Sequence, residues 1–109
     1  MRALKIYSNR VLAGELIEVN RQRYVFTYDD LYFSDTNKPG ISLTMPKTQK
    51  AYISEFLFPF FFNMLSEGVN RTLQSTQLKI DEADNFGLLE ATAQYDTIGA
   101  ITVKPIEAK

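Results

Sequence analysis

The chain has 109 residues, a formal net charge of −1, and neither cysteine nor histidine. That length suits one domain around one hydrophobic core, so we expect residues 1–109 to form a single domain. The missing cysteine excludes disulfides and thiolate metal sites, and the missing histidine removes the commonest general base and metal ligand. Without a basic surplus, direct binding of nucleic acid is disfavoured. The composition therefore argues against an enzyme and predicts no metal, no cofactor and no catalytic residues.

The N-terminal residues, from Met1 to Tyr7, lack the continuous apolar stretch of a signal peptide. The densest apolar run, between Phe56 and Leu65, is too short to span a bilayer, which needs about 20 apolar residues. We therefore expect a cytoplasmic protein that does not bind membranes.

The first quarter of the chain predicts an antiparallel meander of three strands. The third strand has the clearest alternation, with Tyr24, Phe26 and Tyr28 on one face. Asn9, in the first turn, suits a positive φ. The expected strands are residues 4–7, 11–19 and 23–28.

Turn-forming residues dominate the next segment, 29–40, in which Leu31 to Phe33 are expected to form one short turn. A short strand is predicted over residues 41–45, ended by Pro46. Residues 47–50 then read as a polar connector to the most apolar part of the chain.

That apolar part predicts the central helix. Its apolar residues recur at the spacing of one helical face, and Phe58 and Phe62 fall outside that face. Pro59 belongs in a first turn, so we expect the helix to begin near residues 56–58 and to end at Ser66–Gly68. The predicted face consists of Leu57, Phe60, Phe61, Met64 and Leu65, of which Leu57, Phe61 and Leu65 are expected in the core.

The remaining elements are a polar helix over residues 71–77 with Asn70 as its N-cap, and a third helix from Asp81 to about residue 94. A last strand is expected over residues 98–103. The chain therefore predicts an α+β fold, with a small twisted antiparallel sheet of about five strands and three short helices on one side.

Carboxylates gather at Asp29 and Asp30 and again at Asp81, Glu82 and Asp84. Neither group has the spacing of a calcium-binding loop, and the five glycines are too far apart for a phosphate-binding loop. We interpret these carboxylates as turn and cap residues.

Four stretches of the chain, taken together, resemble the N-terminal subdomain of HipA-type toxin kinases. The longest, residues 57–71, is similar to the pattern L-F-P-F-F-x-N-L-L-P-E-G-W-x-R. Residues 12–14 match an L-A-G strand, and residues 41–46 are similar to an S-L-S-L-P segment. Residues 85–89 and 96–101 resemble the ending F-x-L-L … D-C-I-G-A-V. Departures are Val69 in place of tryptophan, Ser66 in place of proline, and Gln94-Tyr95 in place of a glycine pair.

The resemblance implies a role. In the full-length kinases this subdomain precedes a larger core that carries nucleotide binding and catalysis. A chain that stops soon after its last strand resembles the small protein HipS, which acts beside a truncated kinase (HipT) and a DNA-binding partner (HipB). The implied function is a non-catalytic accessory or antitoxin subunit that binds a HipA-like serine/threonine kinase, and through it, indirectly, a HipB-like protein. An alternative is a structural half of a split kinase, and a third is an independent small enzyme or ligand-binding module.

The predicted partner surface lies at the end of the central helix and in the turn that follows. Apolar residues left over from the core face, beside one arginine and short polar residues, have the composition of a protein interface. Two alternatives remain: Glu67 and Arg71 pair only with each other, or Val69 packs against the second helix. The predicted surface consists of Phe58, Phe62, Met64, Glu67, Val69, Asn70 and Arg71.

Overall fold

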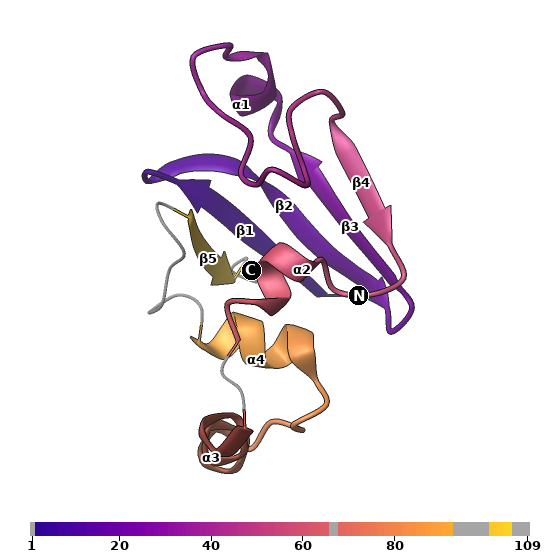
Figure 1. Cartoon of the computed structure of the whole chain (residues 1–109), viewed down its shortest axis with the longest axis vertical. Helices are drawn as coiled ribbons and strands as arrows, with labels where there is room; N and C mark the ends of the chain where they lie inside the picture. The colour runs from indigo at the N-terminus through magenta and orange to yellow at the C-terminus, as the bar shows by residue number, and fades with distance from the viewer. Residues whose placement is uncertain (1, 66–67, 93–100, 106–109) are drawn as a thin grey trace.

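The computed structural model describes residues 2–65, 68–92 and 101–105, and Figure 1 shows their arrangement. Five strands form one antiparallel sheet in the order β4-β3-β2-β1-β5, which confirms the predicted α+β fold. The strands are β1 (Arg2–Ser8), β2 (Val11–Asn20), β3 (Arg23–Tyr28), β4 (Ala51–Ser54) and β5 (Ile101–Pro105). The described helices are α1 (Asp30–Ser34), α2 (Pro59–Phe62), α3 (Gly68–Leu78) and α4 (Asn85–Thr92).

The predicted three-strand meander is confirmed, and a two-residue turn joins its first two strands. Asn9 and Arg10 form this turn with φ values of 50° and 70°. Two successive positive φ values match the type I′ turn, whose twist suits a β-hairpin. Asparagine tolerates this conformation, whereas arginine carries a steric cost there.

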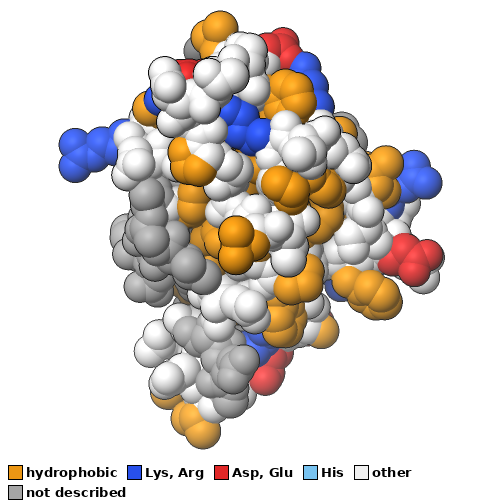
Figure 2. Space-filling view, turned by 45° about the horizontal axis from the view of Figure 1, so that its top comes forward, with side chains coloured by type: hydrophobic (Ala, Val, Ile, Leu, Met, Phe, Trp, Pro, Cys, Tyr) orange, Lys and Arg blue, Asp and Glu red, His pale blue; other side chains and the backbone are white. Residues whose placement is uncertain are grey.

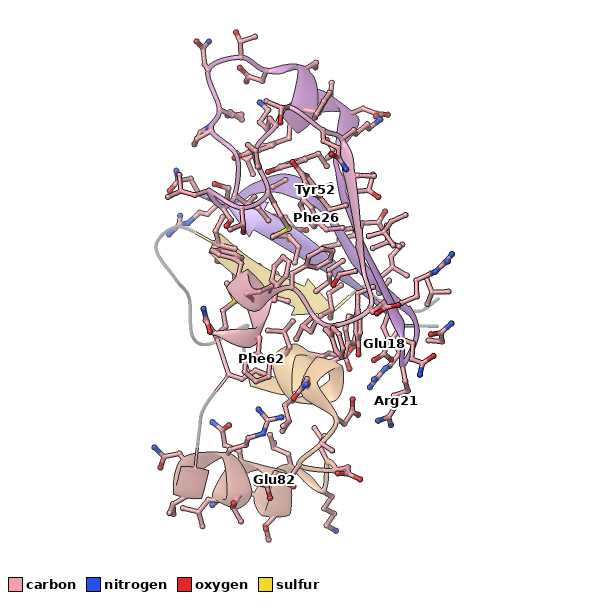
Figure 3. All side chains as sticks on the ribbon, turned by 45° about the vertical axis from the view of Figure 1, so that its right-hand side comes forward. Glu18, Arg21, Phe26, Tyr52, Phe62 and Glu82 are labelled. Atoms are coloured by element: carbon pink, nitrogen blue, oxygen red, sulfur yellow. The ribbon has the colours of Figure 1, made fainter. Side chains whose placement is uncertain are left out.

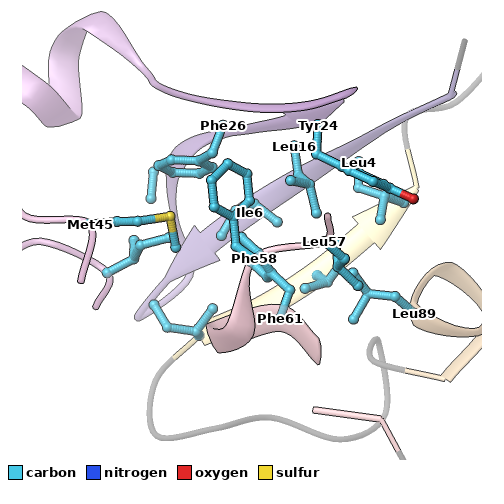
Figure 4. Packing of buried hydrophobic residues seen from close by; sticks show 14 of the residues in the cluster. Leu4, Ile6, Leu16, Tyr24, Phe26, Met45, Leu57, Phe58, Phe61 and Leu89 are labelled. Atoms are coloured by element: carbon cyan, nitrogen blue, oxygen red, sulfur yellow. The ribbon is translucent and has the colours of Figure 1, made fainter. Parts of the chain in front are cut away.

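The two faces of the sheet differ in their surroundings. Leu4, Leu16 and Phe26 stand side by side on neighbouring strands, and their side chains are fully buried. Phe61 from α2 and Leu89 from α4 pack against this face (Figure 4). The opposite face carries charged residues such as Lys5 and Glu15, and no described helix covers it (Figure 1).

The central helix is shorter than predicted, because α2 spans only Pro59–Phe62 and continues as tight turns to Leu65. Phe58 is the N-cap, in an extended conformation with φ −55° and ψ 137°. Helical spacing therefore does not apply to Phe58, and its side chain is 7% exposed, in the core rather than outside it. Leu57, Phe61 and Leu65 are buried, as predicted.

The fourth strand was misplaced by the sequence pattern. Residues 41–45 form a turn with a single bridge between Ser42 and Met45, whereas β4 is formed by the residues after the predicted connector. Ile41 and Met45 are nevertheless buried, because the Tyr28 hydroxyl accepts from the Ile41 amide at 3.0 Å and donates to the Met45 carbonyl. The apolar pattern of this segment therefore reports burial, not a strand.

The helix boundaries in the second half also need correction. Gly68, predicted to end the central helix, is the first residue of α3, which places Asn70 inside a helix instead of at its N-cap. The cap of α4 is Asp84, not Asp81, since an Asp84 carboxylate oxygen accepts from the Gly87 amide at 3.1 Å. Asp81 instead accepts from the Ala83 amide in the preceding turn.

Two further boundaries extend beyond the described residues. The predicted end of the third helix and the start of the last strand, residues 93–100, lie outside them, and β5 is described from Ile101. The segment predicted as one short turn at Leu31–Phe33 forms α1, so the described residues contain four helices rather than three.

Candidate partner-binding surface

The helix α3 lies at one end of the molecule, with α4 between it and the sheet (Figure 1). Val69 and Leu73, four residues apart on one helical face, are 75% and 53% exposed. Arg71, Gln74 and Ser75, on the opposite face, are partly buried. Figure 2 accordingly shows hydrophobic atoms at the tip of the molecule where α3 lies. The helix therefore turns Val69 and Leu73 towards solvent and Arg71 towards the protein.

Polar contacts hold α3 in this orientation. Arg71 donates from Nε and Nη2 to the Glu82 carbonyl at 3.0 and 2.8 Å, and Nη2 also donates to the Asn85 side chain. Its guanidinium carbon lies 5.9 Å from the centre of the Phe62 ring. Figure 3 shows Glu82 beside α3 and Phe62 beside α4. Arg71 thus joins three segments and is not a free surface charge.

The C-terminus of α3 is fixed by its backbone. Lys79 has a φ of 57°, and the Ile80 amide donates to the Ser75 carbonyl at 3.1 Å. This is the Schellman arrangement, in which a left-handed residue ends the helix and satisfies its last carbonyls. The side chain of Ile80 then packs against the core, which secures the return of the chain to α4.

The predicted surface residues have different surroundings. Phe58 is buried and offers little surface, Met64 is partly buried against the core, and Phe62 is 41% exposed. Val69 and Asn70 are exposed on α3. Glu67 lies outside the described residues, so its pairing with Arg71 cannot be placed. The structure brings Phe62 and Arg71 together, and contact with a partner stays a prediction.

An ion-pair cluster beside this surface was missed by the sequence interpretation. Arg2 donates to Glu18 at 2.9 and 2.6 Å and to Asp84 at 3.0 and 2.8 Å. The guanidinium also lies 5.1 Å from the centre of the Phe86 ring, and the Tyr24 hydroxyl donates to Glu18 at 3.1 Å. No sequence pattern could link these residues, because they come from β1, β2, β3 and the start of α4.

Charge and burial within this cluster shift its protonation equilibria. Hydrogen bonding from Arg2 lowers the pKa of Asp84, and hydrogen bonding to Asp84 raises the pKa of Arg2. Burial raises the pKa of the Tyr24 hydroxyl, and the negative charge of Glu18 adds to that increase. Arg2 and Asp84 therefore stay ionised at neutral pH, Tyr24 is a hydrogen-bond donor, and the cluster acts as a structural link.

The described part of the chain contains no group of three carboxylates that could hold a metal ion. Within the same residues, no helix is long and apolar enough to cross a membrane.

Comparison with known proteins identifies the family. The family model of the HipA N-terminal domain matches residues 4–104. Two curated proteins of Sinorhizobium fredii are similar: "Putative kinase Y4mE" is 24% identical over 105 residues and "Putative kinase Y4dM" is 31% identical over 110 residues. These alignments cover 96% and 95% of this chain, but 25% and 26% of the relatives. The chain thus spans about a quarter of the length of the curated relatives it matches.

A solved structure supports the fold independently. The N-terminal domain of HipA toxin superposes with a TM-score of 0.72 at 23% sequence identity, covering 100% of this chain and 96% of that one. At this identity the likeness establishes the fold alone. The family match, which extends over nearly the whole chain, establishes membership: this chain belongs to the HipA N-terminal domain family.

Proposed function

We propose that the protein is a non-catalytic subunit that binds and regulates a HipA-like serine/threonine kinase in a toxin–antitoxin system. The family match is to the N-terminal HipA domain, and the curated relatives named as kinases are about four times as long as the matched region. A HipB-like DNA-binding protein would be reached only indirectly, through the kinase. The protein itself needs no cofactor in this role.

The observation that carries the proposal is the outward apolar face of α3. Val69 and Leu73 together expose apolar area that nothing in the described chain covers, and such area on a small protein marks an interaction site. Asn70, next to Val69 on α3, adds an exposed polar group, whereas the partly exposed Phe62 ring lies beside Arg71 on the opposite side of the helix. An apolar centre with a polar rim is the anatomy of a protein interface.

The test is a binding measurement with a HipA-like kinase as the partner. Val69→Asp should weaken the affinity at least about tenfold, because it places a charge in the apolar centre. The matched control is Leu31→Asp on α1, at the opposite end of the molecule, where the side chain is 81% exposed (Figure 1). If both folded variants bind like the parent, the kinase contacts another surface.

Arg71 is a poor probe for the same question. A charge reversal at this position would remove its bonds to Glu82 and place a carboxylate beside that carbonyl. Such a variant would lose binding through displacement of α3 even if Arg71 never touched the kinase. The Val69 variant avoids this ambiguity, because Val69 points away from the protein.

A second candidate function is a structural part of a split kinase that is required for activity. It is favoured by the match of this chain to about a quarter of relatives that are themselves named as kinases. Co-expression separates the two functions. An antitoxin should lower the toxicity and autophosphorylation of the kinase, whereas a structural part should raise both.

A further inference from the structure

A hollow of about 430 Å³ opens on the uncovered face of the sheet, where the β1–β2 turn lies beside β5. We call it the hairpin hollow, and its lining residues are Tyr7, Arg10, Thr102 and Lys104. Tyr7 and Thr102 are cross-strand partners, and the Lys104 ammonium lies 5.4 Å from the centre of the Tyr7 ring. Figure 1 shows the β1–β2 turn and β5 away from α3, so the hollow is separate from the surface proposed for the kinase.

Both charges in the lining of the hairpin hollow are positive. Arg10 and Lys104 are exposed, and neither makes a hydrogen bond or ion pair with a residue in the described ranges. The next charges on this face are Lys5, directly opposite Lys104, and Glu15, directly opposite Lys5, and these two cancel. Two positive charges therefore stay unbalanced among the described residues, and the hollow favours an anion over a cation.

Other acidic groups of the described chain are too far away to change this balance. Asp29 and Asp30 line a neighbouring hollow with Lys50, which pairs with Asp30. The Asp29 amide donates to the Ala13 carbonyl, three residues along the chain from Arg10 and so roughly 10 Å away at the rise of a strand. This separation exceeds the Debye length of about 8 Å at physiological salt, so the two acids are largely screened.

The backbone of Arg10 gives a second reason to expect a ligand. Its φ of 70° falls at the second central residue of a type I′ turn, where glycine is preferred. The guanidinium makes no polar contact in the described chain that would offset this steric cost. Residues held in the left-handed region concentrate at functional sites, where the side chain is required. Lys5 and Lys104 add a further cost, since like charges directly opposite each other on paired strands repel.

We propose that the hairpin hollow binds a phosphate monoester. Such a group carries about 1.5–2 negative charges at neutral pH and so balances the two unpaired cations, whereas a carboxylate would neutralise only one. The Arg10 guanidinium has the geometry to donate two parallel hydrogen bonds to phosphate oxygens. The hydroxyls of Tyr7 and Thr102, which bond to no other described residue, are further donors. The volume lies within the range of about 300–1,000 Å³ for ligand pockets.

A nucleic-acid backbone fits the same surface less well. Each phosphodiester carries a single charge, and a duplex needs a row of basic residues along its path. Two unpaired cations on a chain with a net charge of −1 do not supply such a row. The inference is independent of the proposed kinase partner, so the protein alone is sufficient for its test.

The test is an NMR titration of the full chain with methyl phosphate. The amide signals of residues 7–11 and 102–104 should shift, with a dissociation constant of about 1–10 mM. Arg10→Gly relieves the backbone strain, so this variant should fold and yet bind at least about fivefold more weakly, as should Lys104→Gln. The matched control is Arg23→Gln, which removes an exposed arginine from β3 and should bind within about twofold of the parent.

The pH dependence tests the charge of the ligand. The second pKa of a phosphate monoester is about 6, so lowering the pH from 7 to 5 should weaken binding by up to about tenfold. The chain has no histidine, so no side chain with an ordinary pKa titrates in this interval. An affinity that stays constant between these pH values would overturn a site for the dianion.

Two further probes separate the possible sources of the phosphate. Dimethyl phosphate, a diester, should bind at least about threefold more weakly than methyl phosphate; equal binding would overturn a monoester site in favour of a nucleic-acid backbone. N-acetyl-O-phosphoserine N-methylamide should bind at least as tightly as methyl phosphate. Equal affinity supports a small free phosphate as the ligand, and tighter binding supports a phosphorylated residue of a protein. Absence of shifts with both monoesters, or unchanged affinity in Arg10→Gly, would overturn the inference.

Discussion

Arg2 and Asp84 stand 82 positions apart in the sequence and are joined by two hydrogen bonds in the folded protein, Nη1 to Oδ2 at 3.0 Å and Nη2 to Oδ1 at 2.8 Å. Two parallel bonds between one guanidinium and one carboxylate fix orientation as well as distance. The pair ties the first residue of β1 to the residue that caps α4. It therefore links the start of α4 to the start of β1 in the sheet.

Replacing Asp84 by asparagine should lower the free energy of unfolding by about 1–3 kcal/mol, because Arg2 would lose a charged partner in a partly buried site. Asparagine remains a good N-cap, so α4 should keep its start. Urea unfolding followed by circular dichroism measures the change. The control is Asp30→Asn, whose carboxylate pairs with Lys50 but is 82% exposed, and it should change stability by less than about 1 kcal/mol.

The contribution of Asp84 should also depend on pH. Its pKa in the folded protein lies below the ordinary value of 3.8, because Arg2 donates hydrogen bonds to the carboxylate. A lowered folded pKa gives a stabilisation that is complete above the unfolded pKa and is lost as the pH falls through the folded one. The difference in unfolding free energy between the parent and Asp84→Asn should therefore be constant near neutral pH and narrow below about pH 4. A difference that stays constant into the acid range would contradict this.

Phe61→Ala should lower the free energy of unfolding by about 3–5 kcal/mol, because the ring is fully buried and its loss leaves a cavity. The ring centre lies 6.0 Å from that of Phe26 in the sheet and 5.3 Å from that of Phe60. Thermal unfolding would show the loss as a large drop in Tm. Phe56→Ala is the matched control, since a 75% exposed ring should cost less than about 0.5 kcal/mol.

Arg10→Gly should stabilise the protein by about 0.5–1 kcal/mol. An L-residue with a φ of 70° carries a steric cost of about 1–2 kcal/mol, which glycine avoids, while glycine adds about 0.5–1 kcal/mol of unfolded-state entropy. Chemical denaturation should show a higher midpoint with an unchanged slope. Arg23→Gly, in a strand, lacks the steric relief and should destabilise by about 0.5–1 kcal/mol.

Arg71→Ala should loosen α3 without unfolding the sheet. The guanidinium contributes two hydrogen bonds to the Glu82 carbonyl, and few apolar contacts would hold the helix once they are lost. Amide hydrogen exchange should therefore speed up in residues 69–78 and change little in β1 to β3. Arg23→Ala, an exposed arginine on β3, should leave the exchange of α3 unchanged. Uniform acceleration across the protein would instead mean that α3 and the sheet unfold as one unit.

The elements that the sequence predicted well are those governed by neighbouring residues. Alternation in Tyr24, Phe26 and Tyr28 predicted a half-buried strand, and Asn9 predicted a turn with positive φ. The spacing of Leu57, Phe61 and Leu65 correctly predicted that these three residues of the apolar run are buried, although it missed Phe58. Each of these signals acts over one or two turns of backbone, so the order of the chain is enough to reveal it.

The sequence by itself therefore determined the fold class, the meander and the resemblance to the HipA N-terminal domain. Only the tertiary structure decided that Phe58 is buried, that the fourth strand is β4 and not residues 41–45, and that Arg2 pairs with Asp84. It also decided that α3 turns Val69 outward while Arg71 bonds inward. These outcomes depend on which distant segments of the chain come into contact. Such contacts join residues far apart in the sequence, so they produce no periodic pattern of residue types from which they could be predicted.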